Sequence, residues 1–308
     1  MNGISSSPQP AAPAPSATRV PQDSSAAAVD YIHGYSEREA VRLGDQADVL
    51  APLLHEGTAY PAGSRVLEVG CGVGAQTVHL LASSPGARIV SVDRSRESLG
   101  LARARVAAHA PAARVEWCHG DLFDLPFAEG EFDHLFVCFV LEHLGDPVAA
   151  LRRLRPLVKP GGSITVIEGD HGSALFHPDS ALARAAIDCH TRLQAAAGGD
   201  AHLGRRLQPL LAEAGYTRVT VRPRTVYADR TRPEMVRGFT RDTFIPVIAS
   251  VRDQAVASGL ATAEDFDRGM ADLRRTAVDD GVFHYTFFKA VAHRPAMAHR
   301  PAGEGDAG

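Results

Sequence analysis

Acidic residues and glycines follow several short apolar runs in this sequence. The stretch "VLEVGCGVG" places Glu68 two residues before a bend with glycines at positions 70, 72 and 74. "GCGVGA" satisfies the pattern G-x-G-x-x-A, and Asp93 follows about 20 residues later, where dinucleotide-binding folds place a ribose-binding carboxylate. From the glycines and Asp93 alone, a nicotinamide dinucleotide is one interpretation of the ligand.

Glu68 favours a different ligand. A carboxylate that faces the ligand beside the turn repels a pyrophosphate, whereas it attracts an ammonium or a sulfonium group. Further along, "GDLFDLPF" places Asp121 after a third apolar run. There a carboxylate can accept a hydrogen bond from an adenine amino group, and the next backbone amides can meet the ring nitrogens. Together the acids predict a pocket for a positively charged nucleoside.

A parallel sheet would position these residues. The pattern alternates between helix-like or turn-like segments and five β-branched or aromatic runs, at 65–69, 88–92, 113–117, 133–138 and 163–168. Such alternation is typical of a parallel sheet covered on both faces, which binds ligands at the carboxyl ends of its strands. Ser95 and the pair Asp146-Pro147 are expected to begin helices. We therefore expect the glycines and acids at one edge of the sheet.

The rest of the chain divides by composition. Residues 1–28 and 293–308 are rich in Pro, Ala, Ser or Gly and predict disordered tails. Residues 29–292 form one predicted domain. Its sheet comes from 64–170, 216–223 and 281–292, and its cap segments are 29–60, 171–215 and 224–280. The segment 35–54 carries a helical apolar stripe, and 224–280 is too long for a plain connection, so it predicts a helical cap or an oligomer interface.

Composition narrows the classes of partner. The net charge is -4 and the pI near 6.4, so no basic field attracts nucleic acid. No apolar run approaches the roughly 20 residues of a membrane span. Four scattered cysteines and the absence of an apolar leader predict free thiols and a cytoplasmic location. We predict no metal site, nucleic-acid partner or membrane partner, and leave monomer or homo-oligomer open.

Five motifs together resemble a known family. "VLEVGCGVG", "VSVDRS", "GDLFDLPF", "FDHLFVCFVLEHLGDP" and "LRPLVKPGG" appear in the order and at the spacings of class I S-adenosylmethionine-dependent methyltransferases. The resemblance covers about 64–170 and is closest to the branch that includes the ubiquinone and menaquinone biosynthesis methyltransferases. It implies an α/β, Rossmann-like fold with a mostly parallel seven-stranded sheet, the last strand antiparallel. It also implies S-adenosyl-L-methionine as the cofactor.

The resemblance assigns roles by position. Glu68, Gly70 and Gly72 would meet the methionine end of the cofactor, Asp93 would hold the ribose hydroxyls, and Asp121 with the Leu122 amide would read the adenine. The N-terminal helix would close over the cofactor through Tyr31, Tyr35 or Gln46, or would only pack against the sheet as an amphipathic helix. The complete set of predicted cofactor-binding residues is Tyr31, Gln46, Glu68, Gly70, Gly72, Asp93, Arg94, Asp121, Leu122 and Cys138.

The predicted function is methyl transfer to a small, apolar or aromatic metabolite. C-methylation of an indole-type substrate in bacterial secondary metabolism is one version, suggested by analogy with capped natural-product methyltransferases, and O- or N-methylation are others. The candidate catalytic residues are His143, after the fourth strand, and Glu168 and His171, after the fifth. Aromatic residues that could wall an acceptor pocket are Tyr227, Phe239, Phe244, Phe283 and Tyr285.

Two other functions compete. An NAD-dependent oxidoreductase would use the same glycine turn and needs no acid at position 68. A catalytically silent relative would bind the cofactor as a scaffold or regulator, without turnover.

Overall fold

A computed structural model describes residues 37–296. The predicted tail 1–28, Tyr31, Tyr35 and residues 297–308 lie outside that range. The predicted second tail was placed too early, because His293 still pairs in the sheet and the Arg294 side chain donates to the carbonyls of Pro156 and Val158, both at 2.6 Å.

Seven strands form one sheet in the order β3-β2-β1-β4-β5-β7-β6. The strands are β1 (Arg65–Val69), β2 (Arg88–Asp93), β3 (Val115–His119), β4 (Phe132–Cys138), β5 (Val158–His177), β6 (Thr217–Ala228) and β7 (Val282–His293). β7 runs antiparallel to both β5 and β6, and the neighbours among β1 to β5 pair in parallel. The predicted Rossmann-like fold with an antiparallel last strand is therefore confirmed.

Helices cover both faces of this sheet. They are α1 (Glu37–Leu54), α2 (Thr77–Ser83), α3 (Arg96–His109), η1 (Leu141–His143), α4 (Pro147–Leu154), η2 (Arg155–Leu157), α5 (Ala181–Ala196), η3 (Leu203–Arg206), α6 (Leu207–Glu213), α7 (Pro233–Met235), η4 (Val236–Phe244), α8 (Ile245–Ser250), α9 (Arg252–Ala257) and α10 (Ala263–Arg275). The predicted caps of α3 and α4 form, because Ser95 Oγ accepts from Ser98 N at 3.1 Å and Asp146 Oδ1 from Ala149 N at 2.8 Å.

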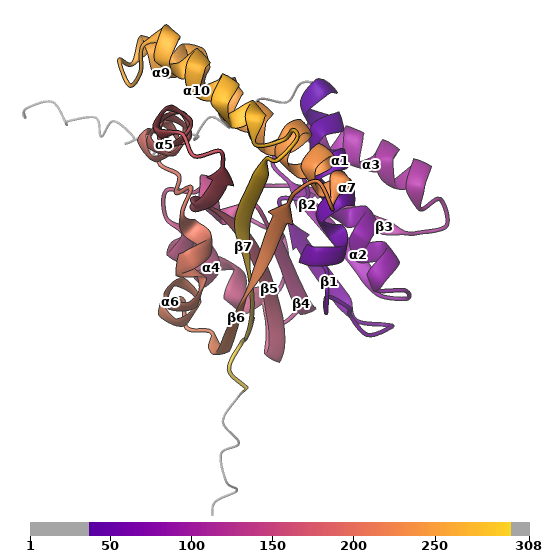
Figure 1. The fold of residues 1–308 in the computed structure, drawn as a ribbon. Coiled ribbons are helices and arrows are strands. Elements are labelled where there is room, and N and C mark those ends of the chain that lie inside the picture. The colour runs from indigo at the N-terminus through magenta and orange to yellow at the C-terminus, as the bar shows by residue number, and fades with distance from the viewer. Residues whose placement is uncertain (1–36, 297–308) are drawn as a thin grey trace, which may run out of the picture.

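Two strands extend beyond the predicted runs. β5 begins at Val158 and continues to His177, and β6 continues to Ala228, whereas the 12 residues of β7 match the predicted strand to within one residue. The added length carries β5 and β6 past the carboxyl ends of β1 and β4. The segments α7 to α10 gather at this extended end (Figure 1). The segment 224–280 therefore begins as strand and becomes a helical cap only after Ala228.

The two faces of the sheet bury separate apolar clusters. On β4, Leu135 and Val137 pack with α4 and α6, whereas Phe136 and Cys138 pack with α1, α5 and the cap. Strand alternation explains this division, since successive side chains point to opposite faces. No helix in 37–296 is long and apolar enough to cross a membrane. All four cysteines lie in this range and are free.

α1 lies against the glycine turn that follows β1. Its Ala47 packs with Val73 and Ala75, and its Asp48 lies 3.1 Å from His79 of α2. At the other end of α1, the buried Lys289 donates to the carbonyl oxygens of Leu54 and Glu56. The predicted N-terminal helix thus lies beside the site to which the sequence assigned it.

Replacing Gly74 by alanine should destabilise the fold by about 2 to 4 kcal/mol. Gly74 has φ +74°, and a Cβ there would lie 2.9 Å from the backbone of Ala102 on α3. The substitution therefore combines left-handed strain with overpacking. Urea unfolding measures the loss. Gly57→Ala is the matched control, since Gly57 has φ +72° but a Cβ added there would meet no atom within 4 Å, and it should lose only about 1 to 2 kcal/mol. Equal losses in both variants would contradict the role of packing.

Candidate active site

The glycine turn after β1 is shaped by β2. Gly70 N and Cys71 N both donate to the carbonyl of Val92, at 2.8 and 2.9 Å. Gly70 and Gly72 have φ of +70° and +51°, a region that favours glycine. A Cβ at Gly72 would meet nothing within 4 Å. The backbone at Gly72 therefore borders open space, which allows close approach of a ligand.

Asp93, at the end of β2, holds the turn in place. Its Oδ2 accepts from Gly72 N at 2.8 Å, and its Oδ1 accepts from Ser95 N at 2.8 Å. Asp93 thus serves the turn and the start of α3 together. Each carboxylate oxygen has a second lone pair, so Asp93 can still accept hydrogen bonds from a diol. A cofactor-binding role for it remains a prediction that this geometry permits.

The sequence led us to expect an exposed Glu68 that faces the ligand beside the turn. The structure instead buries this side chain. It is 2% exposed, and its Oε2 accepts from the hydroxyls of Thr77 and Ser91, both at 2.7 Å. Burial raises the pKa of Glu68 to about 7, although both hydroxyls lower it and Asp93 raises it further. Its Oε1 has no hydrogen-bond partner among residues 37–296. A buried acid with one unpaired oxygen fits a cationic group bound above the turn.

The other predicted cofactor residues lie on α1 and at the carboxyl ends of β2, β3 and β4. Leu122 and Gln46 are half-buried, while Arg94 and Asp121 are exposed. Asp121 Oδ1 accepts from Phe123 N at 2.8 Å, which closes the loop after β3. Cys138 is 8% exposed at the end of β4, and burial raises its thiol pKa, with Glu168 adding to the rise. The contacts of these residues with a cofactor remain predictions.

Glu168 has a different position from the one expected of a general base. The side chain is fully buried, and Oε1 accepts from Val140 N at 3.1 Å and Leu141 N at 2.8 Å. Burial and the nearby Glu142 raise its pKa well above the usual range. A carboxyl engaged with the backbone of the loop after β4 is suited to hold that loop. These contacts favour a positioning role for Glu168, and its part in catalysis stays a prediction.

His143 remains a candidate base. It ends η1, directly after β4, and its side chain is 21% exposed. Burial lowers its pKa to about 4, and His190 and Arg94 lower it further. The imidazole is therefore neutral at physiological pH. A neutral imidazole at the carboxyl end of β4 can accept a proton, but the lowered pKa makes it a weaker base than an ordinary histidine.

His171 stacks on a histidine that was not among the residues predicted from the sequence. The rings of His171 and His190 lie 4.7 Å apart at 7°, and Tyr285 Oη lies 3.1 Å from His171 Nδ1. His190 is 1% exposed on α5, and burial lowers its pKa to about 4. The signal was present in the sequence, since His190 occupies the inward stripe of the predicted helix with Ala186 and Leu193.

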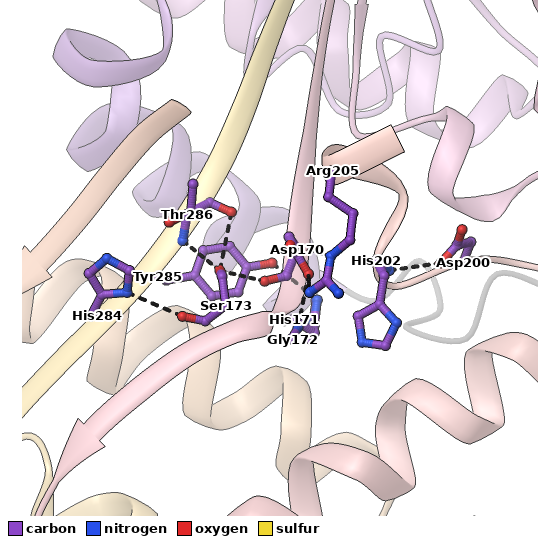
Figure 2. A network of polar contacts seen from close by, with 10 residues as sticks. All are labelled: Asp170, His171, Gly172, Ser173, Asp200, His202, Arg205, His284, Tyr285 and Thr286. Atoms are coloured by element: carbon purple, nitrogen blue, oxygen red, sulfur yellow. Dashed lines mark hydrogen bonds and ion pairs between the residues drawn. The ribbon is translucent and has the colours of Figure 1, made fainter. Parts of the chain in front are cut away.

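An ion pair supports the segment around His171. Arg205 of η3 forms a two-point contact with Asp170, Nε to Oδ2 at 2.7 Å and Nη2 to Oδ1 at 2.6 Å. Figure 2 shows Arg205 reaching across to Asp170 beside His171 and Gly172. Ser173 Oγ, in turn, donates to the Asp170 carbonyl and accepts from Thr286 N on β7. These contacts hold the irregular part of β5 against β7 and η3. Sequence spacing gave no sign of this pair.

The segment between α5 and η3 covers the loop after β4. The Glu142 carbonyl accepts from Asp200 N at 2.8 Å and from Gln194 Nε2 at 3.1 Å. Burial raises the pKa of the Glu142 carboxyl to about 7, and Asp200 adds to the rise. Residues 194–200 therefore pack over η1. This packing brings His190 of α5 close enough to His143 to affect its pKa.

Most of the predicted aromatic wall is closed core. Phe239, Phe244, Phe283 and Tyr285 are at most 3% exposed and pack on one another. Tyr227 is 45% exposed on β6 and lies outside this packed cluster. η4 is a π-helix, in which residues five apart lie on the same side of the helix. The ring centres of Phe239 and Phe244 are therefore only 6.2 Å apart. In an α-helix these two rings would face different directions.

Part of this chain is similar in sequence to known methyltransferases, and that part contains the glycine turn. Residues 66–162 match the family model described as "Methyltransferase domain". The chain is 34% identical over 200 residues to an uncharacterized 37.1 kDa protein of transposon TN4556 from Streptomyces fradiae, covering 62% of this chain and 56% of that protein. It is 30% identical to the ubiquinone/menaquinone biosynthesis C-methyltransferase UbiE of Paracoccus denitrificans, covering 44% of this chain and 58% of the enzyme.

The fold also resembles that of a solved [4+2]-cyclase, SpnF. The TM-score is 0.52 at 20% identity, and the match covers 81% of each chain. The chain spans less than two thirds of the length of the two sequence relatives. One fold can host different reactions, so the chemistry must be argued from the site itself.

Proposed function

We propose that this chain, whose residues 66–162 match the model of a methyltransferase domain, is a class I S-adenosylmethionine-dependent methyltransferase that transfers a methyl group from S-adenosyl-L-methionine to a small molecule. The cofactor supplies a methyl group already activated on a sulfonium. The chain's own residues then have to bind the cofactor, hold the acceptor in line with the methyl group and exclude water.

One observation carries the proposal. Asp93 holds the glycine turn through Gly72 N, while the space beside Gly72 is open and the buried Glu68 keeps one oxygen without a partner among residues 37–296. Asp93 would accept from ribose hydroxyls through the remaining lone pairs of its carboxylate. Glu68 supplies negative potential to the sulfonium and ammonium groups. A dinucleotide would bring a pyrophosphate to this acid instead, and like charges would repel.

The sheet also disfavours the oxidoreductase alternative. Dinucleotide-binding folds repeat a parallel βαβαβ half on each side of the switch point, with strand order 3-2-1-4-5-6. In this chain an antiparallel β7 lies between β5 and β6. The second half therefore lacks the parallel strand order that binds the second nucleotide.

The acceptor is proposed to lie above the carboxyl ends of β4 and β5. We propose His143 as the group that takes a proton from it, and His171, which contacts Tyr285, as a second candidate. The aromatic residues of β7 and η4 are closed core, so support for an apolar or aromatic metabolite, an indole included, comes from the half-buried Phe139, whose ring lies 5.5 Å from that of Phe287. Methylation on carbon, nitrogen or oxygen is compatible with these groups, so we propose the acceptor class and not the atom.

Calorimetry with the full chain tests the proposal. S-adenosylmethionine should bind and NAD should not. Incubation with methyl-labelled cofactor and a panel of indoles, phenols and amines should then yield labelled product, which mass spectrometry identifies. Binding of NAD in place of S-adenosylmethionine would overturn the proposal. Binding of the cofactor without turnover on any acceptor would favour the silent scaffold, a result that the likeness to a cyclase makes worth testing.

A further inference from the structure

Phe139 has an unusual backbone conformation at the centre of the site. It follows the last residue of β4 and has φ +58°, the left-handed region that bulky residues avoid. Its N–H donates to the Ile167 carbonyl at 2.9 Å, so the residue remains attached to β5. Such a conformation persists only where the surrounding structure enforces it.

The left-handed backbone changes the face on which the ring lies. With continued strand alternation, Phe139 would follow Leu135 and Val137 onto the face covered by α4 and α6. Instead it packs against the cluster of the opposite face, with its ring 5.5 Å from that of Phe287. Val140 takes the opposite course and packs with Leu135 and Val137. The turn at Phe139 therefore directs one aromatic ring toward the aromatic residues of β7.

Glu168 enforces this turn. Its buried Oε1 accepts from the two amides that directly follow Phe139, those of Val140 and Leu141. Two hydrogen bonds to one oxygen fix the direction of the chain immediately after the strained residue. This explains why a carboxyl lies fully buried at the end of the straight part of β5.

Phe139 lies between the glycine turn and the aromatic cluster of β7. Its neighbour Val140 lies against Gly70, where an added Cβ would come within 2.5 Å of Val140 Cγ2. On the other side, Phe139 reaches Phe287 and so the aromatic cluster. Phe287 is 3% exposed, whereas Phe139 is half-buried. Phe139 is thus the accessible edge of the aromatic cluster beside the cofactor turn.

We propose that Phe139 is the residue that selects the acceptor, by stacking on a flat aromatic ring beside the cofactor, and that Glu168 is the positioning residue that holds it there. This inference rests on the proposed function, because it places the ring next to a bound cofactor. The acceptor class it names is an aromatic metabolite, in preference to an aliphatic one of similar size.

A binding titration tests the role of Phe139. The fluorescence of 2-naphthol reports its binding to the full chain in the presence of saturating S-adenosylhomocysteine. The wild type should bind 2-naphthol more tightly than cyclohexanol in competition. Phe139→Leu should weaken 2-naphthol binding about tenfold and leave the affinity for S-adenosylhomocysteine unchanged. The control Tyr227→Leu removes an exposed ring on β6 and should change neither.

The outcomes separate this inference from the proposed function. Failure of the wild type to bind S-adenosylhomocysteine counts against the proposed function. Two results overturn the role of Phe139 when the wild type binds S-adenosylhomocysteine normally. One is that the wild type does not bind 2-naphthol, and the other is that Phe139→Leu binds 2-naphthol as tightly as the wild type does. Parallel loss of both ligands in Phe139→Leu also overturns it, because the residue would then be structural.

The role of Glu168 needs a conservative rescue. Glu168→Gln keeps a carbonyl oxygen for the amides of Val140 and Leu141 and should keep 2-naphthol affinity, whereas Glu168→Ala should lose it as Phe139→Leu does. Should Glu168→Ala fail to fold, the strain itself remains measurable. Phe139→Gly should then melt at a higher temperature than Phe139→Ala, because glycine accepts φ +58° without strain. Equal melting temperatures, or loss of affinity in Glu168→Gln, would refute the positioning role.

Discussion

Asp93→Ala is expected to weaken S-adenosylmethionine binding by about 10² to 10⁴-fold. Two hydrogen bonds from ribose hydroxyls to a carboxylate contribute about 1.5 to 3 kcal/mol each, and every 1.4 kcal/mol is tenfold in affinity. The same change removes the acceptors of Gly72 N and Ser95 N. We therefore expect a parallel loss of about 1 to 3 kcal/mol in the free energy of unfolding. Calorimetry and urea unfolding measure the two effects.

Asp188→Ala is the matched control for Asp93→Ala. Asp188 is an exposed acid on α5 that pairs with Arg192, one helical turn away, at 4.0 Å. Its removal should leave cofactor affinity and stability nearly unchanged. If Asp93→Ala bound the cofactor as tightly as this control, Asp93 would be only a cap of the turn, and the ribose assignment would be lost.

Glu68→Gln is expected to stabilise the free protein at pH 8 and to weaken cofactor binding at the same time. The folded-state pKa of Glu68 is about 7, above its ordinary value of 4.5, so the folded state holds the proton more tightly than the unfolded chain. Stability from this group is therefore fully present below pH 4.5 and falls as the pH rises to about 7. Above pH 7 the buried carboxylate costs about 3 kcal/mol, which glutamine avoids.

Two measurements check this expectation. Urea unfolding at pH 5 and pH 8 should show a gain for Glu68→Gln that is larger at pH 8, while Glu129→Gln, on an exposed loop, should show none. Cofactor affinity of the wild type should increase as the pH rises through 7, because the ionised Glu68 attracts the sulfonium and ammonium groups. In the variant it should be lower and should lose this dependence. A variant that binds the cofactor as the wild type does would show that Glu68 is only a structural acid.

The parts of the fold that depend on local pattern were predictable from the sequence. β1 was predicted at its observed bounds, and Ser95 and Asp146 begin helices as expected, because strand alternation and helix capping involve residues close in sequence. The order of the motifs also identified the glycine turn and the acid at the end of β2. Residues that follow successive parallel strands meet at one edge of the sheet whatever the details of packing.

Only the tertiary structure decided what these acids contact. Glu68 and Glu168 are both acids near strand ends in the sequence, yet the fold buries one between two hydroxyls and binds the other to the amides after Phe139. The stacking of His190 on His171 and the pair between Arg205 and Asp170 join segments that are 19 and 35 residues apart. Such contacts depend on how α5 and η3 pack over β5. Side-chain period places His190 on the inward stripe of its helix, but neither period nor spacing tells which surface that stripe packs against, since this is set by the shapes of surfaces that are distant in the chain.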